Sequence, residues 1–222
     1  MALCGDESRA WFGKGQMTSR IFQNIAPGQA GNALRFRDFM MRVIEDFTIF
    51  NDFSCGVPEA EDTDKFLHDD AGRYFEEGVA VTYGLFFDES SKARSARWHL
   101  PKGASRTPIG FATLQDDTLE IPGKKYSRHI PAVRIRRLGI RKMMQNKGLG
   151  STFLFMIRKL FLSQPETQGA HRYLTLNTYP SLVHFYEKNN FIVLGGKPAR
   201  PKPTEQLFMY LDSKAKSIHL IR

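Results

Sequence analysis

Strand-like and helix-like segments alternate along the second half of the chain, and this order constrains the fold more than any other feature of the sequence. The first segment, IPAVRIRRLGI, alternates apolar and basic residues as a half-buried strand does. In chain order the predicted segments are a strand at 130–140, a glycine-bearing turn at 144–150, an apolar helix at 151–162, a strand at 172–178, a helix at 181–191 and a strand at 205–212. Strands that alternate with helices in this way predict an α/β fold, with helices on the faces of a mixed sheet.

The first half of the chain adds helices and a strand pair to this pattern. Apolar residues recur at near-helical spacing over 33–50, which predicts an amphipathic helix, and a second helix is predicted over 60–76. β-Branched and aromatic residues predict strands over 79–87 and 108–115. The polar and basic residues 88–107 are predicted to form the loop between these two strands.

Length and composition fit one domain with an N-terminal extension. The 222 residues are 41% hydrophobic and include 18 Phe, which is enough for a core filled largely by aromatic rings. Residues 1–32 show little periodicity. We therefore assign 1–32 to an extension of undetermined structure and 33–222 to the domain.

The sequence gives no sign of export or of a membrane span. No apolar run approaches the ~18–20 residues of a membrane-spanning helix, and the N-terminus lacks the basic-then-apolar pattern of a signal peptide. Cys4 and Cys55 are too few for a disulfide framework or a four-thiolate zinc site. We therefore expect a cytoplasmic protein in a reducing compartment, without membrane contact and without a metal.

Positive charge is concentrated in the second half of the chain. The net charge is +9, but from residue 123 onward 19 Lys and Arg face four acidic residues, whereas the first 122 residues carry a net charge of −6. Such a distribution predicts an anionic partner on one side of the molecule, either the phosphates of a nucleotide or a nucleic acid. The alternative is a solvated basic surface that keeps the protein soluble.

The turn QNKGLG, from Gln145 to Gly150, lies between a predicted strand and a predicted helix and resembles an anion site. Free backbone N–H groups at a helix N-terminus bind phosphate, and Gly148 and Gly150 allow a phosphate to approach the backbone closely. The spacing is neither that of a Walker loop nor that of GxGxxG. The alternative is that the glycines only permit a tight turn and close helix packing.

Two stretches around this turn resemble the GNAT acetyltransferase superfamily. RRLGIRKMMQNKGLGSTFL resembles its acyl-CoA-binding core, whose signature [Q/R]-x-x-G-x-[G/A] is matched by Gln145, Gly148 and Gly150. LTLNTYPSLVHFYEKNNF resembles the strand and helix that follow in the family. PIGFATL and EQLFMYLD are similar to its third and closing strands, so the resemblance covers about residues 35–212.

A further stretch, FSCGVPEAEDTDKFLHDDA followed by VTYGLFF, resembles the N-terminal pattern of one GNAT subgroup. That subgroup includes toxins of bacterial toxin–antitoxin pairs that acetylate the α-amine of aminoacyl-tRNA. The resemblance implies an N-acetyltransferase that uses acetyl-CoA, binds tRNA through the basic second half and has an antitoxin protein as partner. The alternatives are a GNAT enzyme for a protein or small-molecule amine, and a non-catalytic module that binds acyl-CoA or nucleic acid. The oligomeric state, a homodimer included, stays open.

The resemblance also implies a fold and a set of site residues. The fold is a mixed, mostly antiparallel sheet flanked by helices. Tyr186 matches the family's general acid, a phenol that protonates the leaving thiolate. The turn amides would hold the pyrophosphate, and the edge of strand 130–140 would pair with the pantetheine arm. The residues implied in binding acetyl-CoA are Leu138, Gly139, Ile140, Gln145, Asn146, Lys147, Gly148, Leu149, Gly150, Ser151 and Asn177.

Other residues compete for the catalytic roles, and Tyr186 itself could simply pack in the core. The competing phenols are Tyr83, Tyr173 and Tyr179. No general base is evident from the sequence. The candidate bases, each better explained as a surface or packing residue, are Asp116, Glu120, His129 and His184. Cys55 has no activating histidine beside it in the sequence and is predicted to be structural.

The basic residues around strand 130–140 bear on the acceptor substrate. Alternation predicts that Arg134 and Arg136 share one face of the strand, with Val133, Ile135 and Arg137 on the other. Charges beyond those needed for CoA could grip RNA phosphates, and binding would then weaken steeply with salt. The residues meant are Lys124, Lys125, Arg128, Arg134, Arg136 and Arg137. A generic basic surface is the alternative.

Overall fold

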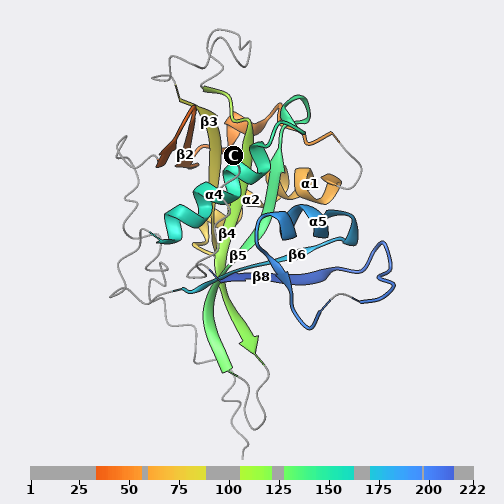
Figure 1. Ribbon diagram of the computed structural model, residues 1–222. Coiled ribbons are helices and arrows are strands. Elements are labelled where there is room, and N and C mark those ends of the chain that lie inside the picture. Colours follow the sequence, from red (N-terminus) through yellow and green to blue (C-terminus); the bar gives the residue numbers. More distant parts are fainter. Residues whose placement is uncertain are drawn as a thin grey trace, which may run out of the picture.

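A single eight-stranded sheet organises the protein (Figure 1). The computed structural model describes residues 34–56, 60–88, 106–121, 128–162, 171–196 and 198–212. The strand order is β1-β2-β3-β4-β5-β6-β8-β7, and neighbours are antiparallel except β5 and β6, which are parallel. The strands are β1 (Leu34–Phe36), β2 (Phe39–Val43), β3 (Ala80–Phe87), β4 (Gly110–Ile121), β5 (Arg128–Ile140), β6 (Tyr173–Thr178), β7 (Ile192–Val193) and β8 (Leu207–Asp212).

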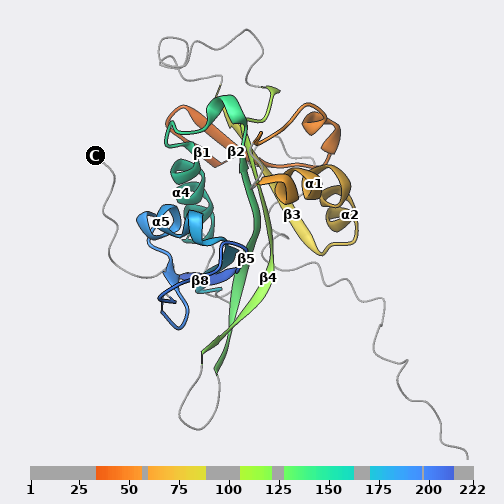
Figure 2. The same cartoon turned by 90° about the vertical axis from the view of Figure 1, so that its right-hand side faces the viewer.

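Helices cover both faces of this sheet (Figure 2). On one face lie α4 (Leu149–Leu162) and α5 (Pro180–Lys188), and on the other lie α1 (Glu61–Asp69) and α2 (Ala71–Glu76). Two short 3-10 helices complete the described helical segments, η1 (Phe47–Phe50) before α1 and η4 (Lys142–Met144) before α4. The described residues therefore form three layers, with the sheet in the middle.

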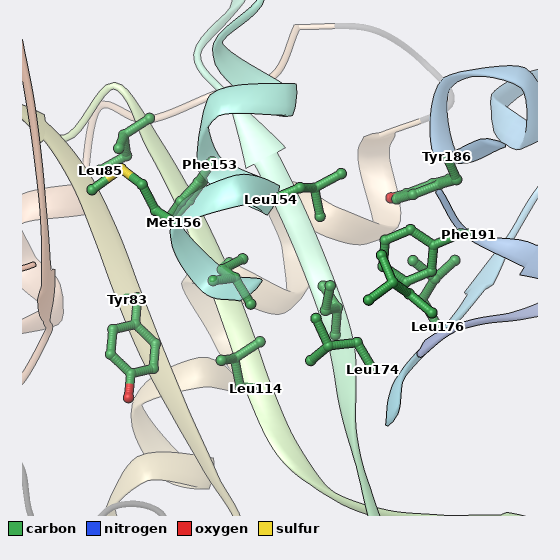
Figure 3. Packing of buried hydrophobic residues seen from close by; sticks show 14 of the residues in the cluster. Tyr83, Leu85, Leu114, Phe153, Leu154, Met156, Leu174, Leu176, Tyr186 and Phe191 are labelled. Carbon is green, nitrogen blue, oxygen red and sulfur yellow. The ribbon is translucent and has the colours of Figure 1, made fainter. Parts of the chain in front are cut away.

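Each face of the sheet has its own hydrophobic core. The larger core lies under α4 and α5, where Leu114, Phe153 and Leu174 are almost fully buried (Figure 3). The smaller core lies under α1 and α2, and Phe53 and Phe111 meet there edge to face at 5.4 Å between ring centroids. Aromatic rings thus fill much of both cores, as the Phe content predicted.

The predicted helix over 33–50 is wrong. The segment instead forms the antiparallel β1–β2 hairpin, closed by a tight turn at which Arg37 has a φ of 55°, followed by η1. The near-helical spacing arose because β2 is apolar on both faces. Phe39 and Met41 enter the larger core, whereas Met40 packs against the smaller one. A strand that carries an apolar residue on its second face loses the period-two signal that would have identified it.

The remaining predicted elements are confirmed, with shifted ends. The helix over 60–76 is divided into α1 and α2 at Asp70, and β4 runs six residues past the predicted end at 115 to Ile121. β5, α4, β6, α5 and β8 fall where strands and helices were expected, and β7 is a short strand that was not predicted. The extension 1–32 and most of the loop 88–107 lie outside the described residues.

Candidate active site

The parallel strands β5 and β6 separate part-way along the sheet, and this split forms the candidate site. In the described part of the chain they pair through three residue positions, which end at Arg134 opposite Thr175. β5 then continues to Ile140 with β4 on its other side, while β6 turns away from it (Figure 1). One edge of β5 therefore faces a gap. Such an edge can pair with an extended ligand as though the ligand were an added strand.

Asp117 clamps the closed end of the gap. Its carboxylate accepts hydrogen bonds from Nε and Nη2 of Arg134, both at 3.1 Å, and from Oγ1 of Thr175. These bonds join β4, β5 and β6 at the last paired position. Arg134, which was a candidate for binding RNA phosphate, already has a carboxylate partner here.

A β-bulge in β5 lies just beyond the clamp. Leu114 pairs with Ile135 and Thr113 pairs with Arg137, so Arg136 has no opposite residue on β4. Two residues then share the space of one, and the alternation of side chains shifts by one position. Arg136 and Arg137 consequently both lie against Phe66 of α1, with guanidinium carbons 5.3 and 5.4 Å from its ring centroid.

The expectation that Arg137 shares a face with Val133 and Ile135 is therefore wrong. Val133 and Ile135 belong to the core under α4 and α5, whereas Arg137 lies on the α1 face. Arg134 and Arg136 share the α1 face, as alternation predicted. After the bulge, Leu138 and Ile140 pack against the larger core.

The glycine turn follows the open end of β5 directly and leads into α4. Gly148 has a φ of +78°, a conformation that glycine adopts at no steric cost, and the Cβ position there is open. Asn146, Lys147 and Gly148 are exposed. The N–H groups of Leu149, Gly150 and Ser151 belong to the first turn of α4, where such groups lack intrahelical acceptors. This end of the site can bind an anion.

The two glycines of the turn have different roles. A Cβ on Gly150 would lie 3.0 Å from Cζ of Phe185, so this glycine lets α5 approach α4 closely. The close-packing interpretation thus applies to Gly150, whereas Gly148 supplies the unusual backbone conformation.

Gln145 holds the turn in place through its side chain. Its Nε2 donates to the carbonyl oxygens of Cys55 at 2.8 Å and Ile140 at 2.9 Å. Both hydrogens of the amide group are thus used within the protein, so the contribution of the Gln145 side chain is to position the turn. The segment before α1 and the turn before α4 are thereby tied together.

Cys55 has the environment of a structural residue. It is 3% exposed, and burial raises the pKa of its thiol well above the ordinary value because the thiolate would be desolvated. Its backbone N–H donates to the Asp64 carboxylate at 3.0 Å. A nucleophilic role does not fit these surroundings.

Tyr186 lies on α5 beside the gap. It is 8% exposed and packs edge to face on Phe185 and Phe191. Figure 3 shows its hydroxyl directed toward Leu154 of α4, away from the backbone of α5. Burial raises the pKa of Tyr186 to about 12, because a phenolate there would be desolvated. The group is thus a neutral proton donor at physiological pH.

The competing tyrosines are less well placed. Tyr83 lies on β3, which β4 separates from β5, and its buried hydroxyl has no hydrogen-bond partner among the described residues. Tyr173 pairs with Ala132 at the closed end of the gap. Tyr179 directly precedes α5, is half-buried and acts electrostatically on Arg137 of β5, so it remains the competitor on the β5 side of the site.

The candidate bases are not gathered at the gap. Glu120 and His129 occupy opposite positions on strands β4 and β5, beyond the closed end of the gap. Asp116 lies opposite Val133 on the same pair of strands. His184 is exposed on α5. Asn177, a predicted cofactor residue, is exposed on β6 past the last β5–β6 pair.

Two features of the site had no clear signal in the sequence. The bulge changes which face Arg137 occupies, and a strict alternation of side chains cannot reveal it. The Asp117 clamp joins positions 117, 134 and 175, which are far apart in the chain. Within the described residues no group of three His, Cys, Asp or Glu could hold a metal ion, and no helix is long and apolar enough to cross a membrane.

The comparisons with known proteins rest on structure alone. No protein-family model and no curated protein sequence matches the chain. A solved structure of a tyrosine-to-phenylalanine mutant of KacT is 17% identical, with a TM-score of 0.55, and the match covers 80% of this chain and 96% of that one. AtaT complexed with acetyl-methionyl-tRNAfMet is 18% identical, with a TM-score of 0.53 and coverage of 80% and 96%.

A third structure is a tyrosine-to-phenylalanine mutant of the toxin AtaT, bound to the C-terminus of the antitoxin AtaR and to acetyl-CoA. It is 18% identical, with a TM-score of 0.54, and the match covers 80% of this chain and 94% of that one. At these identities the likeness concerns the fold. It confirms the predicted GNAT fold, a mixed and mostly antiparallel sheet flanked by helices.

Proposed function

We propose that this chain is an acetyl-CoA-dependent N-acetyltransferase whose acceptor is the α-amine of aminoacyl-tRNA. The observation that carries the proposal is the gap between β5 and β6. It combines an unpaired strand edge, a glycine turn at the start of α4 and a buried phenol on α5. Structures with the same fold include AtaT with acetyl-methionyl-tRNAfMet and AtaT with acetyl-CoA and an antitoxin segment.

The donor substrate would lie along β5. The backbone of β5 from Leu138 to Ile140 would pair with the pantetheine arm in the place that a further strand would take, except at the Ile140 carbonyl oxygen, which already accepts from Gln145. The N–H groups from Asn146 to Ser151 would surround the pyrophosphate at the positive end of the α4 dipole, whereas the N–H of Gln145 already donates to the carbonyl oxygen of Lys142. Asn177 on β6 would contact the arm from the opposite side of the gap.

The reaction would need little more than orientation and one proton donor. The amine nitrogen attacks the thioester carbonyl carbon, the carbon–sulfur bond breaks, and the thiolate takes a proton from Tyr186. The new amide nitrogen releases its extra proton to solvent, from which the phenolate recovers one. A backbone N–H at the β5 bulge, where the ladder with β4 is interrupted, is the donor that we assign to the developing oxyanion.

The charge distribution favours RNA as the acceptor. The second half of the chain, which contains β5 and the glycine turn, carries far more cations than the donor phosphates require. A polyamine acceptor would be repelled by the same charges. By the likeness to AtaT, an antitoxin protein is the partner to look for, and we place the reaction in the cytoplasm.

Acetyl transfer from radiolabelled acetyl-CoA tests the proposal. The enzyme is offered charged tRNA, uncharged tRNA and a cell extract stripped of RNA in parallel. We expect label on charged tRNA alone, with transfer reduced at least about 100-fold in Tyr186→Phe while CoA binding persists. Label that appears only in the RNA-free extract would make the chain a transferase for another amine. Binding of CoA without transfer to any acceptor would make it a non-catalytic module.

A further inference from the structure

Arg136 and Arg137 form a pair of adjacent guanidinium groups beside the gap. The bulge in β5 places both on the face covered by α1, where each stacks on the single ring of Phe66. The two groups lie on the opposite face of β5 from α4 and α5. The glycine turn and α4 would hold the donor on the other face, so we take the side of this pair as the one from which the acceptor reaches the thioester.

Arg136 is fixed by neutral partners. Its Nη1 donates to Oε1 of Gln115 at 2.9 Å, and its Nη2 donates to the hydroxyl of Tyr74 at 3.0 Å. The guanidinium also lies 4.6 Å from the Tyr74 ring centroid. These contacts hold the group in one orientation without neutralising its charge.

Arg137 has fewer partners still. Its Nη1 donates to the carbonyl oxygen of Arg136 at 2.9 Å, and its buried Nε has no partner among the described residues. A guanidinium carries five N–H donors, and with Nε buried and one Nη1 hydrogen used, the remaining Nη donors are the ones that a ligand can reach. Burial and the charge of Arg136 lower the pKa of Arg137, while exposed Asp62 on α1 and Tyr179 before α5 act in the opposite direction.

Two cations held side by side without a carboxylate are unusual in this protein. No carboxylate of the described residues lies within ion-pair distance of Arg136 or Arg137. By contrast, Arg134, Arg141 and Arg172 each hold an aspartate. Partly buried charges cost free energy unless they are paired, so this arrangement suits an anion that arrives from outside.

We propose that Arg136 and Arg137 bind the phosphate of the 3′-terminal nucleotide of the acceptor RNA and so place the aminoacyl amine at the thioester. This inference rests on the proposed function. In an aminoacyl-tRNA the amino acid carboxylate is consumed in the ester, so the negative charge nearest to the amine is that phosphate. Arginine forks match phosphate oxygens in geometry as well as in charge. Arg137 is the direct ligand of the phosphate. The backbone carbonyl oxygen of Arg136 holds the Arg137 side chain, and the positive charge of Arg136 strengthens the attraction for the phosphate.

Two small acceptors that differ by one phosphate test this site. Methionine esterified to the 3′-hydroxyl of adenosine 5′-monophosphate carries the phosphate, and the same ester of adenosine lacks it. For the unaltered protein we expect kcat/KM to be roughly ten- to a hundredfold higher with the phosphate, mainly through KM, because a charge-assisted bond is gained. Arg137→Gln should lose that factor on the phosphate-bearing ester and lose nothing on the adenosine ester.

The control variant is Arg172→Gln, which removes the same charge from an arginine that is paired with Asp212. It should leave both esters unaffected. Arg137→Lys should retain part of the phosphate preference, and unchanged CoA affinity and melting temperature would show that Arg137→Gln folds.

Several results would overturn the inference. Equal kcat/KM values of the unaltered protein for the two esters would show that the phosphate is not a ligand. An equal loss on both esters in Arg137→Gln would make Arg137 a structural residue. A dependence on Arg137 that appears instead with free methionine would identify a carboxylate as the ligand. If aminoacyl-tRNA and both esters stay unlabelled while another amine is acetylated, the proposed function itself fails. The proposal that Arg136 and Arg137 bind an RNA phosphate then fails as well.

Discussion

Tyr186 holds its proton more tightly than an exposed tyrosine does. Its ring lies between Phe185 and Phe191, and this apolar setting disfavours the phenolate. A general acid with a pKa near 12 stays fully protonated between turnovers at neutral pH. Because the phenol is protonated at neutral pH, it is not available as a base, and in the proposed reaction the acceptor amine must arrive neutral or lose its proton elsewhere.

Replacing Tyr186 by Phe should therefore reduce kcat without loosening the fold. The ring and its contacts remain, and one hydroxyl is removed. We expect kcat to fall roughly 100- to 10,000-fold, the range that positioned acids supply. Affinity for CoA, measured by titration calorimetry, should change less than about twofold. A matched Tyr173→Phe variant should keep its kcat, and normal turnover by Tyr186→Phe would remove the residue from the mechanism.

The raised pKa of Tyr186 also makes stability depend on alkaline pH. Below pH 10, the ordinary tyrosine pKa, the phenol is neutral in both the folded and the unfolded chain. Between pH 10 and about 12 the unfolded chain releases this proton while the folded chain keeps it, so the unfolding free energy falls with pH. The loss is at most about 3 kcal/mol for this group.

Urea unfolding of the protein and of Tyr186→Phe at a series of pH values measures this effect. The variant should lose less stability between pH 10 and 12. A remaining slope is expected, because burial also raises the pKa of Tyr83. Identical slopes for the two proteins would mean that Tyr186 is more hydrated in solution than its 8% exposure indicates.

At the scale of elements, the segment from β5 to α4 combines three backbone features in a short length of chain. The bulge redirects Arg136 and Arg137, the split from β6 frees one strand edge, and Gly148 turns the chain into α4. The side chain of Gln145 then fixes the turn to the carbonyl of Cys55. In the proposed function, substrate positioning thus depends on the backbone of this one continuous segment.

Gly148→Ala tests this dependence, and Gly195→Ala is its control. Both glycines have positive φ values, 78° and 79°, with open space at Cβ, so each substitution should cost about 1–2 kcal/mol of stability through backbone strain. Gly195 lies after β7, outside the segment. We expect CoA affinity to fall about tenfold or more in Gly148→Ala alone. Equal CoA affinity in the two variants would exclude the turn from the donor site.

The sequence predicts the fold of the second half better than that of the first, and the reason is physical. In the second half each element shows a single period, and the glycine turn marks the junction of β5 with α4. In the first half the second face of β2 carries the apolar, partly buried Met40, which interrupts the alternation of a strand and produces a helix-like spacing. The bulge at Arg136 and the Asp117 clamp depend on pairing between distant strands, which local patterns do not contain.

At the scale of the whole molecule, the charge asymmetry should govern encounters with RNA. We expect tRNA affinity to fall roughly ten- to a hundredfold between about 50 and 200 mM salt, because bound counterions are released on association. CoA affinity should change far less, since fewer charges are involved. Filter binding at several salt concentrations measures both ligands.

Removing the charges of Lys124, Lys125 and Arg128 should flatten the salt dependence of tRNA binding. Arg128 is exposed at the start of β5, and the two lysines lie outside the described residues. The CoA affinity of this triple variant should match that of the unaltered protein. An unchanged salt slope would assign RNA binding to another surface.

The split sheet also bears on how the protein avoids aggregation. Its outer strands offer little to a neighbouring chain, since β1 has three residues and β7 has two. The long unpaired edge of β5 instead faces inward, with α4 and α5 on one side and α1 on the other. Because helices flank this edge on both faces of the sheet, it is less accessible to the strand of another polypeptide than an outer strand would be.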